Sequence, residues 1–249
     1  MSFEKFDQHI EGEYWKKYFE KDKVFYATIR DHLFRALAQT PDSAGLDIGS
    51  GPGVGAKLLD DLNIKTTLTG YEPSMTAADG VELLKELEKK GSKVKYIPVQ
   101  GGIEKIPTPE INSLDYVLIL RAAHEIAESL GGYDKFFSEL ERVIVGLKES
   151  GKIIIAEPQY DKDFNDQTEI IEKVREFKQI KIGHSHIPSD YITDEEMIAF
   201  MNRKSFKKME EDIVVDQSTL DQLRAQGIAI EKSPCYFYVH TYQREGVAD

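Results

Sequence analysis

The sequence predicts a doubly wound α/β fold, in which an open and mostly parallel β-sheet carries helices on both faces. Short apolar runs alternate with helical patterns from about residue 44 to residue 158. Several of these runs contain continuously apolar stretches, such as residues 116–120 and 153–156, which are typical of parallel strands that are buried on both faces. A glycine-rich turn joins the first apolar run to the first helical segment. Repeated strand–helix units of this kind imply one open parallel sheet.

Six segments have the composition of strands. Five lie in the alternating region, and the sixth is a segment near the C-terminus in which apolar and polar residues alternate. The predicted strands cover residues 44–48, 66–71, 93–99, 114–120, 152–157 and 235–242.

Helices are expected between these strands. The clearest covers residues 133–147, where Phe136, Leu140 and Val143 share one helical face. A second should follow the glycine turn directly, and a third should end at Gly91. The acidic run after Thr193 suits the positive end of a helix dipole and predicts a further helix there.

Composition and charge exclude several classes of protein. The 249 residues include 32 Lys and Arg against 44 Asp and Glu, a net charge of −12 that repels nucleic acid. No apolar run approaches the roughly 18 residues that a membrane span needs, and the N-terminus lacks the apolar core of a secretion signal. The single cysteine excludes an internal disulfide. We therefore expect a cytoplasmic protein without nucleic-acid or membrane partners, whose oligomeric state the sequence leaves open.

The glycine turn carries the strongest functional signal. The first strand runs into Gly49-Ser50-Gly51-Pro52-Gly53, and a helix follows. Glycines at such a turn let a ligand lie against the backbone. Glu72 ends the second strand about 20 residues later, where an acidic side chain can accept both hydroxyls of a ribose. Together these features predict a ligand that contains adenosine, at the carboxyl edge of the sheet.

Two kinds of adenosine ligand remain open. Counted from Gly51, the turn satisfies the G-x-G-x-x-A pattern of a dinucleotide site, so an NAD-dependent oxidoreductase is one alternative. Pro52 lies inside that pattern, however, and proline donates no amide to a pyrophosphate. Asp47, two residues before the first glycine, would also repel a pyrophosphate and suits a cationic ligand better.

An ordered set of motifs between about residues 43 and 200 resembles a known family, the class I S-adenosylmethionine-dependent methyltransferases of the small-molecule type. The motifs are Leu46-Asp47-Ile48-Gly49-Ser50-Gly51-Pro52-Gly53, Tyr71-Glu72-Pro73-Ser74, Gly101-Gly102-Ile103-Glu104-Lys105-Ile106-Pro107, the strand 114–120 followed by Ala123-His124-Glu125, the strand that begins at Gly151, and Thr193-Asp194-Glu195-Glu196. One glycine turn alone would be weak evidence, but the motifs occur in the family's order.

The resemblance implies a Rossmann-like sheet of seven strands in the order 3-2-1-4-5-7-6 with the seventh antiparallel, and S-adenosylmethionine as cofactor. By position, Asp47 would orient the ammonium group of the cofactor, and Glu72 would hold its ribose. The other implied cofactor-binding residues are Gly49, Ser50 and Gly51 along the glycine turn, Pro73 and Ile103 beside the adenine, Gly102, and Arg121 through its backbone. Gly102 departs from the family, which often has Asp there; Glu104 or a backbone carbonyl is the expected substitute.

Candidate residues for the chemistry lie past the fourth and fifth strands. Methyl transfer is an in-line displacement, and a base helps where the acceptor must lose a proton. His124 is the candidate base, with a structural histidine at a helix start as its alternative. Glu157 and Tyr160 are candidate substrate-binding residues, as are Tyr14 and Tyr18 of the N-terminal aromatic cluster, which otherwise is plain core. No metal site is predicted.

The sequence thus predicts one methyltransferase domain over residues 1–249. Residues 1–42 would form N-terminal helices and a lid, 43–160 the cofactor-binding core, 161–192 a cap insertion, and 193–249 a C-terminal helix and strands. The expected activity is methyl transfer from S-adenosylmethionine to a small molecule. The alternatives are an NAD-dependent oxidoreductase and a regulator that binds S-adenosylmethionine without catalysis.

Overall fold

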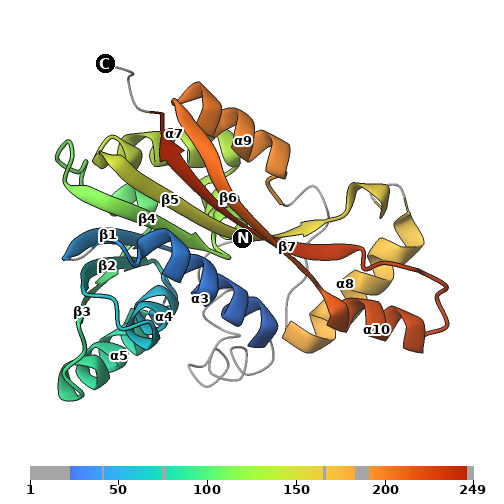
Figure 1. Ribbon diagram of the computed structural model, residues 1–249. Coiled ribbons are helices and arrows are strands. Elements are labelled where there is room, and N and C mark those ends of the chain that lie inside the picture. The colour runs from blue at the N-terminus through green and yellow to red at the C-terminus, as the bar shows by residue number, and fades with distance from the viewer. Residues whose placement is uncertain (1–22, 41, 75–76, 165–166, 183–190, 246–249) are drawn as a thin grey trace.

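Seven strands form one sheet in the computed structural model, which describes residues 23–40, 42–74, 77–164, 167–182 and 191–245 (Figure 1). The strand order is β3-β2-β1-β4-β5-β7-β6. Strands β1 to β5 pair in parallel, whereas β7 is antiparallel to both β5 and β6. The predicted fold class and strand order are therefore confirmed. The strands are β1 (Ser43–Ile48), β2 (Thr66–Glu72), β3 (Val94–Gln100), β4 (Leu114–Leu120), β5 (Leu147–Tyr160), β6 (Phe206–Val215) and β7 (Cys235–Arg244).

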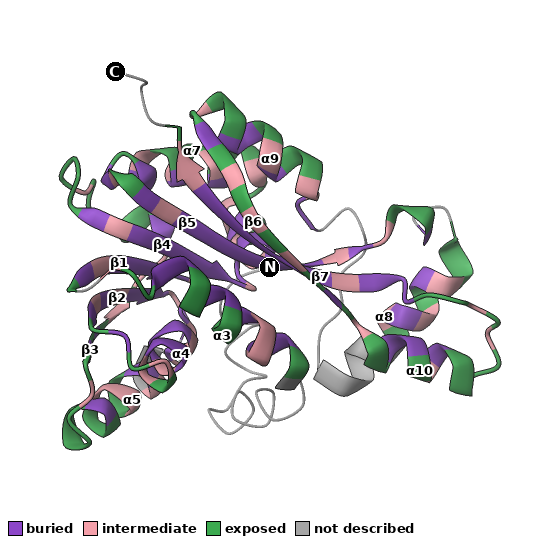
Figure 2. Cartoon of the chain, viewed as in Figure 1, coloured by how far each residue is buried: buried purple, intermediate pink, exposed green. Residues whose placement is uncertain are grey.

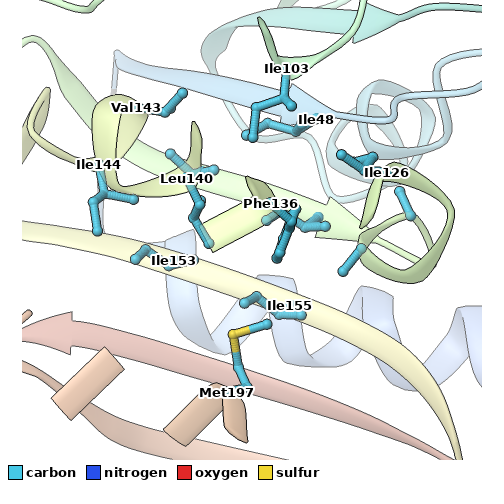
Figure 3. Close-up of a cluster of buried hydrophobic side chains, with 14 of the residues drawn as sticks. Ile48, Ile103, Ile126, Phe136, Leu140, Val143, Ile144, Ile153, Ile155 and Met197 are labelled. Carbon is cyan, nitrogen blue, oxygen red and sulfur yellow. The ribbon is translucent and has the colours of Figure 1, made fainter. Parts of the chain in front are cut away.

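Helices cover both faces of this sheet, and each face has its own apolar core (Figure 2). On one face α6, α7 and α9 pack against the strands through residues such as Phe136, Leu140 and Met197 (Figure 3). On the other face α3, α4 and α5 contribute residues such as Ile29, Leu59 and Leu87. The helices are α3 (Lys23–Leu37), α4 (Val54–Asp61), α5 (Ala77–Lys89), α6 (Ala123–Leu130), α7 (Tyr133–Ile144), α8 (Thr168–Ile182), α9 (Asp194–Arg203) and α10 (Gln217–Ala225), with short 3₁₀ turns at Ile103–Lys105 and Lys162–Phe164.

The largest difference from the sequence-based expectation is β6, to which no residue range was assigned. This strand lies at the edge of the sheet, and its residues alternate between more and less exposed positions. Its Lys and Glu side chains hide the apolar signal, as is common for edge strands. Strand β5 also begins earlier and ends later than the predicted 152–157.

Two local interactions position the elements around the site. Thr193 and Glu196 form a reciprocal capping box at the start of α9, so the predicted helix start is confirmed. His32, fully buried on α3, bridges the sheet: its Nδ1 lies 2.6 Å from Oδ2 of Asp212, and its Nε2 lies 2.7 Å from Oγ1 of Thr241. Helix α3 is thereby fixed across β6 and β7 (Figure 1). Among the described residues, no helix is long and apolar enough to cross a membrane.

Candidate functional site

A pocket of about 780 Å³, partly open to solvent, lies where β1, β2 and β4 end. The carboxyl ends of strands are where ligands bind in open α/β sheets. Helix α3 closes one side of the pocket with Phe25, Tyr26 and Ile29. The pocket brings together most of the predicted cofactor-binding residues, namely Asp47, Gly49, Ser50, Gly51, Glu72, Pro73 and Arg121.

The glycine turn requires glycine for two different reasons. Gly49 has a positive φ of 71°, and a side chain there would place its Cβ 2.3 Å from the Cβ of Ala122. Gly51 also has a positive φ, of 52°, but its missing Cβ would meet no atom within 4 Å. Backbone conformation thus demands glycine at both positions. The open space beside Gly51 lies in the wall of the pocket and leaves room for a ligand against the backbone.

Backbone amides of the turn are already bonded within the protein. Those of Gly49 and Ser50 both donate to the carbonyl of Tyr71, at 2.9 and 3.1 Å, and those of Gly53 and Val54 donate to the carbonyl of Ser50. The amide of Gly51 donates to a carboxylate instead (Oε2 of Glu72). A pyrophosphate needs amides that point into the site. The five amides of the glycine turn named here all donate to acceptors within the protein instead.

Asp47 is a buried acid that faces the pocket. Its residue is 1% exposed, and neither carboxyl oxygen has a hydrogen-bond partner of normal geometry in the described part of the chain. Burial raises the pKa of the Asp47 carboxyl to about 7, while the backbone of Gly55 opposes that rise and the charge of Glu72 adds to it. An acid of this kind gains most from a cationic ligand that restores its lost hydration.

Glu72 braces the glycine turn from the end of β2. One of its carboxylate oxygens accepts the amide of Gly51 and the other accepts the amide of Ser74, each at 2.9 Å. Each carboxylate oxygen has a further lone pair. Because Glu72 also lines the pocket, those lone pairs are the acceptors that a ribose would use.

Two predicted cofactor-binding residues do not line this pocket. Ile103 is 1% exposed and belongs to the apolar core, where Figure 3 shows it beside Ile48. Gly102 precedes the 3₁₀ turn, and a Cβ built on it would lie 2.3 Å from a carboxylate oxygen of Glu104. Glu104 thus stands next to the place where the family often has Asp. The adenine contacts of Gly102 and Ile103 stay predictions.

His124 is held by a buried carboxylate at the start of α6. Its Nδ1–H donates to Oε2 of Glu157 at 2.6 Å, and the other oxygen of Glu157 accepts the amide of Ala123 at 2.7 Å. Burial alone would lower the pKa of His124, but the charge and hydrogen bond of Glu157 outweigh it and the pKa is raised. Since Nδ1 carries the proton in this arrangement, Nε2 is the nitrogen left to accept one.

Glu125 was not singled out from the sequence, yet it is the member of this group that lines the pocket. Its Oε1 lies 3.7 Å from Nε2 of His124. Burial raises the pKa of Glu125 to about 7, against the opposing charge of His124. The only sequence signal was its place directly after His124 on the helix that follows β4. A carboxyl group that titrates near neutral pH in a pocket is a candidate acid or base.

Arg121 occupies the turn between β4 and α6 in a strained backbone conformation, with a φ of +61°. Its guanidinium lies 5.2 Å from the ring centre of Phe25 and 5.0 Å from that of Phe237. Its amide donates to the carbonyl of Ala156. Burial lowers the pKa of Arg121 to about 10, so this residue remains a cation beside the acidic pocket.

The predicted substrate-binding residues lie apart from the pocket or outside the described residues. Glu157 is fully buried and engaged with His124, and Tyr160 is 3% exposed. Tyr191 connects these two regions, with ring centres 5.8 Å from Tyr160 and 5.0 Å from His124. Tyr14 and Tyr18 lie outside the described residues.

The sheet order and the acid-lined glycine turn agree with the resemblance to the class I methyltransferases. A family model described as "Methyltransferase domain" matches residues 46–155, which include the glycine turn and the strands on both sides of it. The match covers the part of the chain that holds the glycine turn, and the strand order is the one expected from the resemblance to class I S-adenosylmethionine-dependent methyltransferases. No curated protein matches the sequence.

Solved structures show the same fold at low sequence identity. A methyltransferase from Geobacter sulfurreducens, in complex with S-adenosyl-L-homocysteine, is 15% identical, with a TM-score of 0.57 over 87% of this chain and 90% of that chain. A mycolic acid cyclopropane synthase is 16% identical, with a TM-score of 0.62 over 88% and 84%. The cyclase SpnF is 15% identical, with a TM-score of 0.58 over 87% and 80%. Fold alone therefore does not fix the reaction.

Proposed function

We propose that this protein transfers the methyl group of S-adenosylmethionine to a small-molecule acceptor by in-line displacement. The observation that carries the proposal is Asp47, a buried carboxyl without a hydrogen-bond partner of normal geometry among the described residues, which lines a pocket beside Glu72 and the glycine turn. The cofactor supplies a methyl group on a sulfonium and carries a cationic ammonium. Both charges suit a pocket whose lining has three acids, Asp47, Glu72 and Glu125, against one cationic side chain, Arg121.

Each wall of the pocket has a proposed task. Asp47 accepts the ammonium hydrogens and Glu72 accepts the ribose hydroxyls while it holds Gly51 in place. Phe25 and Tyr26 line the pocket from α3, and aromatic rings beside a cation can stabilise it through the ring quadrupole. Together these residues fix the position of one reactant and exclude water, which are the main contributions an enzyme makes to a direct displacement.

Proton removal from the acceptor falls to the acids and the histidine after β4. Glu125 faces the pocket, and Nε2 of His124 lies 3.7 Å from its carboxylate. Glu157 holds the opposite nitrogen of the ring and stabilises the imidazolium that forms when Nε2 receives a proton. We propose that the proton passes from the acceptor to Glu125 and is shared with His124.

The NAD-dependent alternative fits these residues less well. A pyrophosphate would meet the three acids named above, and the amides of the glycine turn that should bind it are bonded elsewhere. A small-molecule acceptor is favoured over a nucleic acid by the net charge of −12.

The test is transfer of isotope-labelled methyl from S-adenosylmethionine to a fractionated mixture of small metabolites. We expect label in one or a few compounds, and a loss of labelling with Glu125→Gln that leaves binding of S-adenosylhomocysteine within about threefold of the original. A protein that binds S-adenosylhomocysteine but labels no small molecule would contradict the proposal and favour the non-catalytic regulator. Label in added protein or nucleic acid alone would contradict the choice of acceptor.

A further inference from the structure

A second polar cluster lies away from the pocket, where α9 meets the outer strands of the sheet. His240 on β7 and Glu211 on β6 are directly paired across the two strands, and Asp194 begins α9. One ligand atom from each residue lies within 4.8 Å of the other two. None of the three lines the pocket described above. These three residues lie far apart in the sequence, so no sequence motif predicts the cluster.

The imidazole of His240 is the unusual member. It is fully buried, and its Nε2 has no hydrogen-bond partner of normal geometry among the described residues. Its other nitrogen, Nδ1, lies 3.0 Å from the hydroxyl of Tyr242 and 3.2 Å from Oδ1 of Asp194. A buried polar atom without a partner calls for an explanation, and a bound ion is one of the few available.

The tautomer of His240 with its proton on Nδ1 would leave Nε2 available as a metal ligand. With the proton of His240 on Nδ1 and donated to the hydroxyl of Tyr242, Nε2 presents a lone pair. That nitrogen lies 3.2 Å from a carboxylate oxygen of Glu211. Oδ1 of Asp194 is a second buried atom without a hydrogen-bond partner of normal geometry among the described residues. A lone pair and two carboxylates that face one another repel unless a cation lies near them, and the ammonium of Lys208 supplies that cation when no metal is bound.

We propose that His240, Glu211 and Asp194 bind a divalent transition-metal ion, with Zn²⁺ as the best match. One imidazole nitrogen and two carboxylate oxygens form a donor set that suits Zn²⁺. The same set disfavours Mg²⁺, which prefers oxygen ligands only. Glu211 is exposed and Asp194 is partly exposed, so the ion has a path from solvent and room for water ligands. Since Asp194 is the first residue of α9, the ion would tie that helix to β6 and β7.

Lys208 is the charged group that competes for this site. Its ammonium contacts Glu211 closely and lies 3.9 Å from Oδ2 of Asp194. Lysine sits on a flexible stem and can move away when a metal binds, but its departure weakens metal binding. Exposed Glu195 adds negative charge next to Asp194 without belonging to the set. The competition provides a direct way to test the assignment.

The test is calorimetric titration of the chelator-treated full chain with Zn²⁺ alone, and with Mg²⁺ as a second probe. Lys208→Met removes the competitor and should tighten Zn²⁺ binding at least about tenfold. Glu211→Gln and Asp194→Asn should each weaken it at least about tenfold, whereas the matched control Glu195→Gln should change it less than about threefold. Mg²⁺ should bind at least a hundredfold more weakly than Zn²⁺.

The opposite pattern would overturn the site. If Lys208→Met binds Zn²⁺ no more tightly, or if Glu211→Gln and Asp194→Asn bind it as well as the unmodified protein, the cluster is an ion-pair network and not a metal site. Binding of S-adenosylhomocysteine should be unchanged in all four variants. That measurement shows that each variant is folded and keeps this test separate from the proposed methyl transfer.

Discussion

Replacement of Asp47 by Asn should make the ligand-free protein more stable relative to the unmodified protein, and this advantage should grow as the pH rises. The same substitution removes a proposed cofactor contact. Burial raises the pKa of Asp47 from its ordinary value of 3.8 to about 7. Between these two values the folded state holds more protons than the unfolded state, so the free energy of unfolding falls as the pH rises. Asn has no such titration.

The magnitude follows from that displacement. Each pKa unit corresponds to about 1.4 kcal/mol, so ionised Asp47 costs the folded protein about 4 kcal/mol above pH 8. Part of this cost is already present at pH 5, which leaves about 2–3 kcal/mol that develops between pH 5 and pH 8. The buried amide of Asn has its own penalty, but that penalty is the same at both pH values.

The assay is urea unfolding of the unmodified protein and of Asp47→Asn at pH 5 and pH 8. We expect the difference in unfolding free energy to shift in favour of Asp47→Asn by about 2–3 kcal/mol at the higher pH. Asp31→Asn is the control, because the Asp31 side chain is 61% exposed and should show no such shift. The same Asp47→Asn variant should lose about tenfold to a hundredfold in affinity for S-adenosylhomocysteine. If the two proteins differ in unfolding free energy by the same amount at both pH values, burial does not raise the pKa of Asp47 and the reasoning is wrong.

Three further substitutions test the rest of the site. Glu72→Ala removes the acceptor of the Gly51 and Ser74 amides and the proposed acceptor of the ribose hydroxyls. Each hydrogen bond to the ribose would be worth about 1.5–3 kcal/mol, so binding of S-adenosylhomocysteine should weaken in calorimetry, and unchanged affinity would remove Glu72 from the ribose site. Glu157→Gln should lower the pKa of His124, so the acidic limb of the pH–rate profile should move to lower pH, and an unmoved limb would show that His124 is structural. His32→Ala should cost at least about 1.5–3 kcal/mol in urea unfolding through its lost bond to Asp212, and a cost below about 0.5 kcal/mol would contradict its role in fixing α3.

Most of the fold could be predicted because its signals are local. Buried parallel strands contain continuous apolar stretches, such as residues 116–120, and the helix at α7 repeats its apolar residues along one face. Edge strand β6 could not be found this way, since its exposed face is charged and its partner β7 lies far along the chain. Pairing across such a distance leaves no local pattern.

The candidate site also contains residues that local motifs predict and residues whose roles depend on tertiary contacts. Asp47, Gly49 and Glu72 were predicted because a glycine turn and a strand end mark them in the sequence. Glu157 was predicted as a substrate contact, but its carboxylate points at His124 and helix α6, a tertiary pairing that no motif encodes.

Glu125 was missed for a related reason, because its raised pKa arises from burial that only the folded chain creates. The structure therefore adds what the sequence does not show, namely which residues line the pocket and which acids are buried.

The most direct test of the central claim is calorimetric titration of the unmodified protein with S-adenosylhomocysteine and, separately, with NAD. A pocket that is lined by acids and has its glycine-turn amides engaged should bind S-adenosylhomocysteine and release heat, and should show no binding of NAD at the same concentrations. Binding of NAD without binding of S-adenosylhomocysteine would contradict the assignment of the pocket and, with it, the proposed methyl transfer.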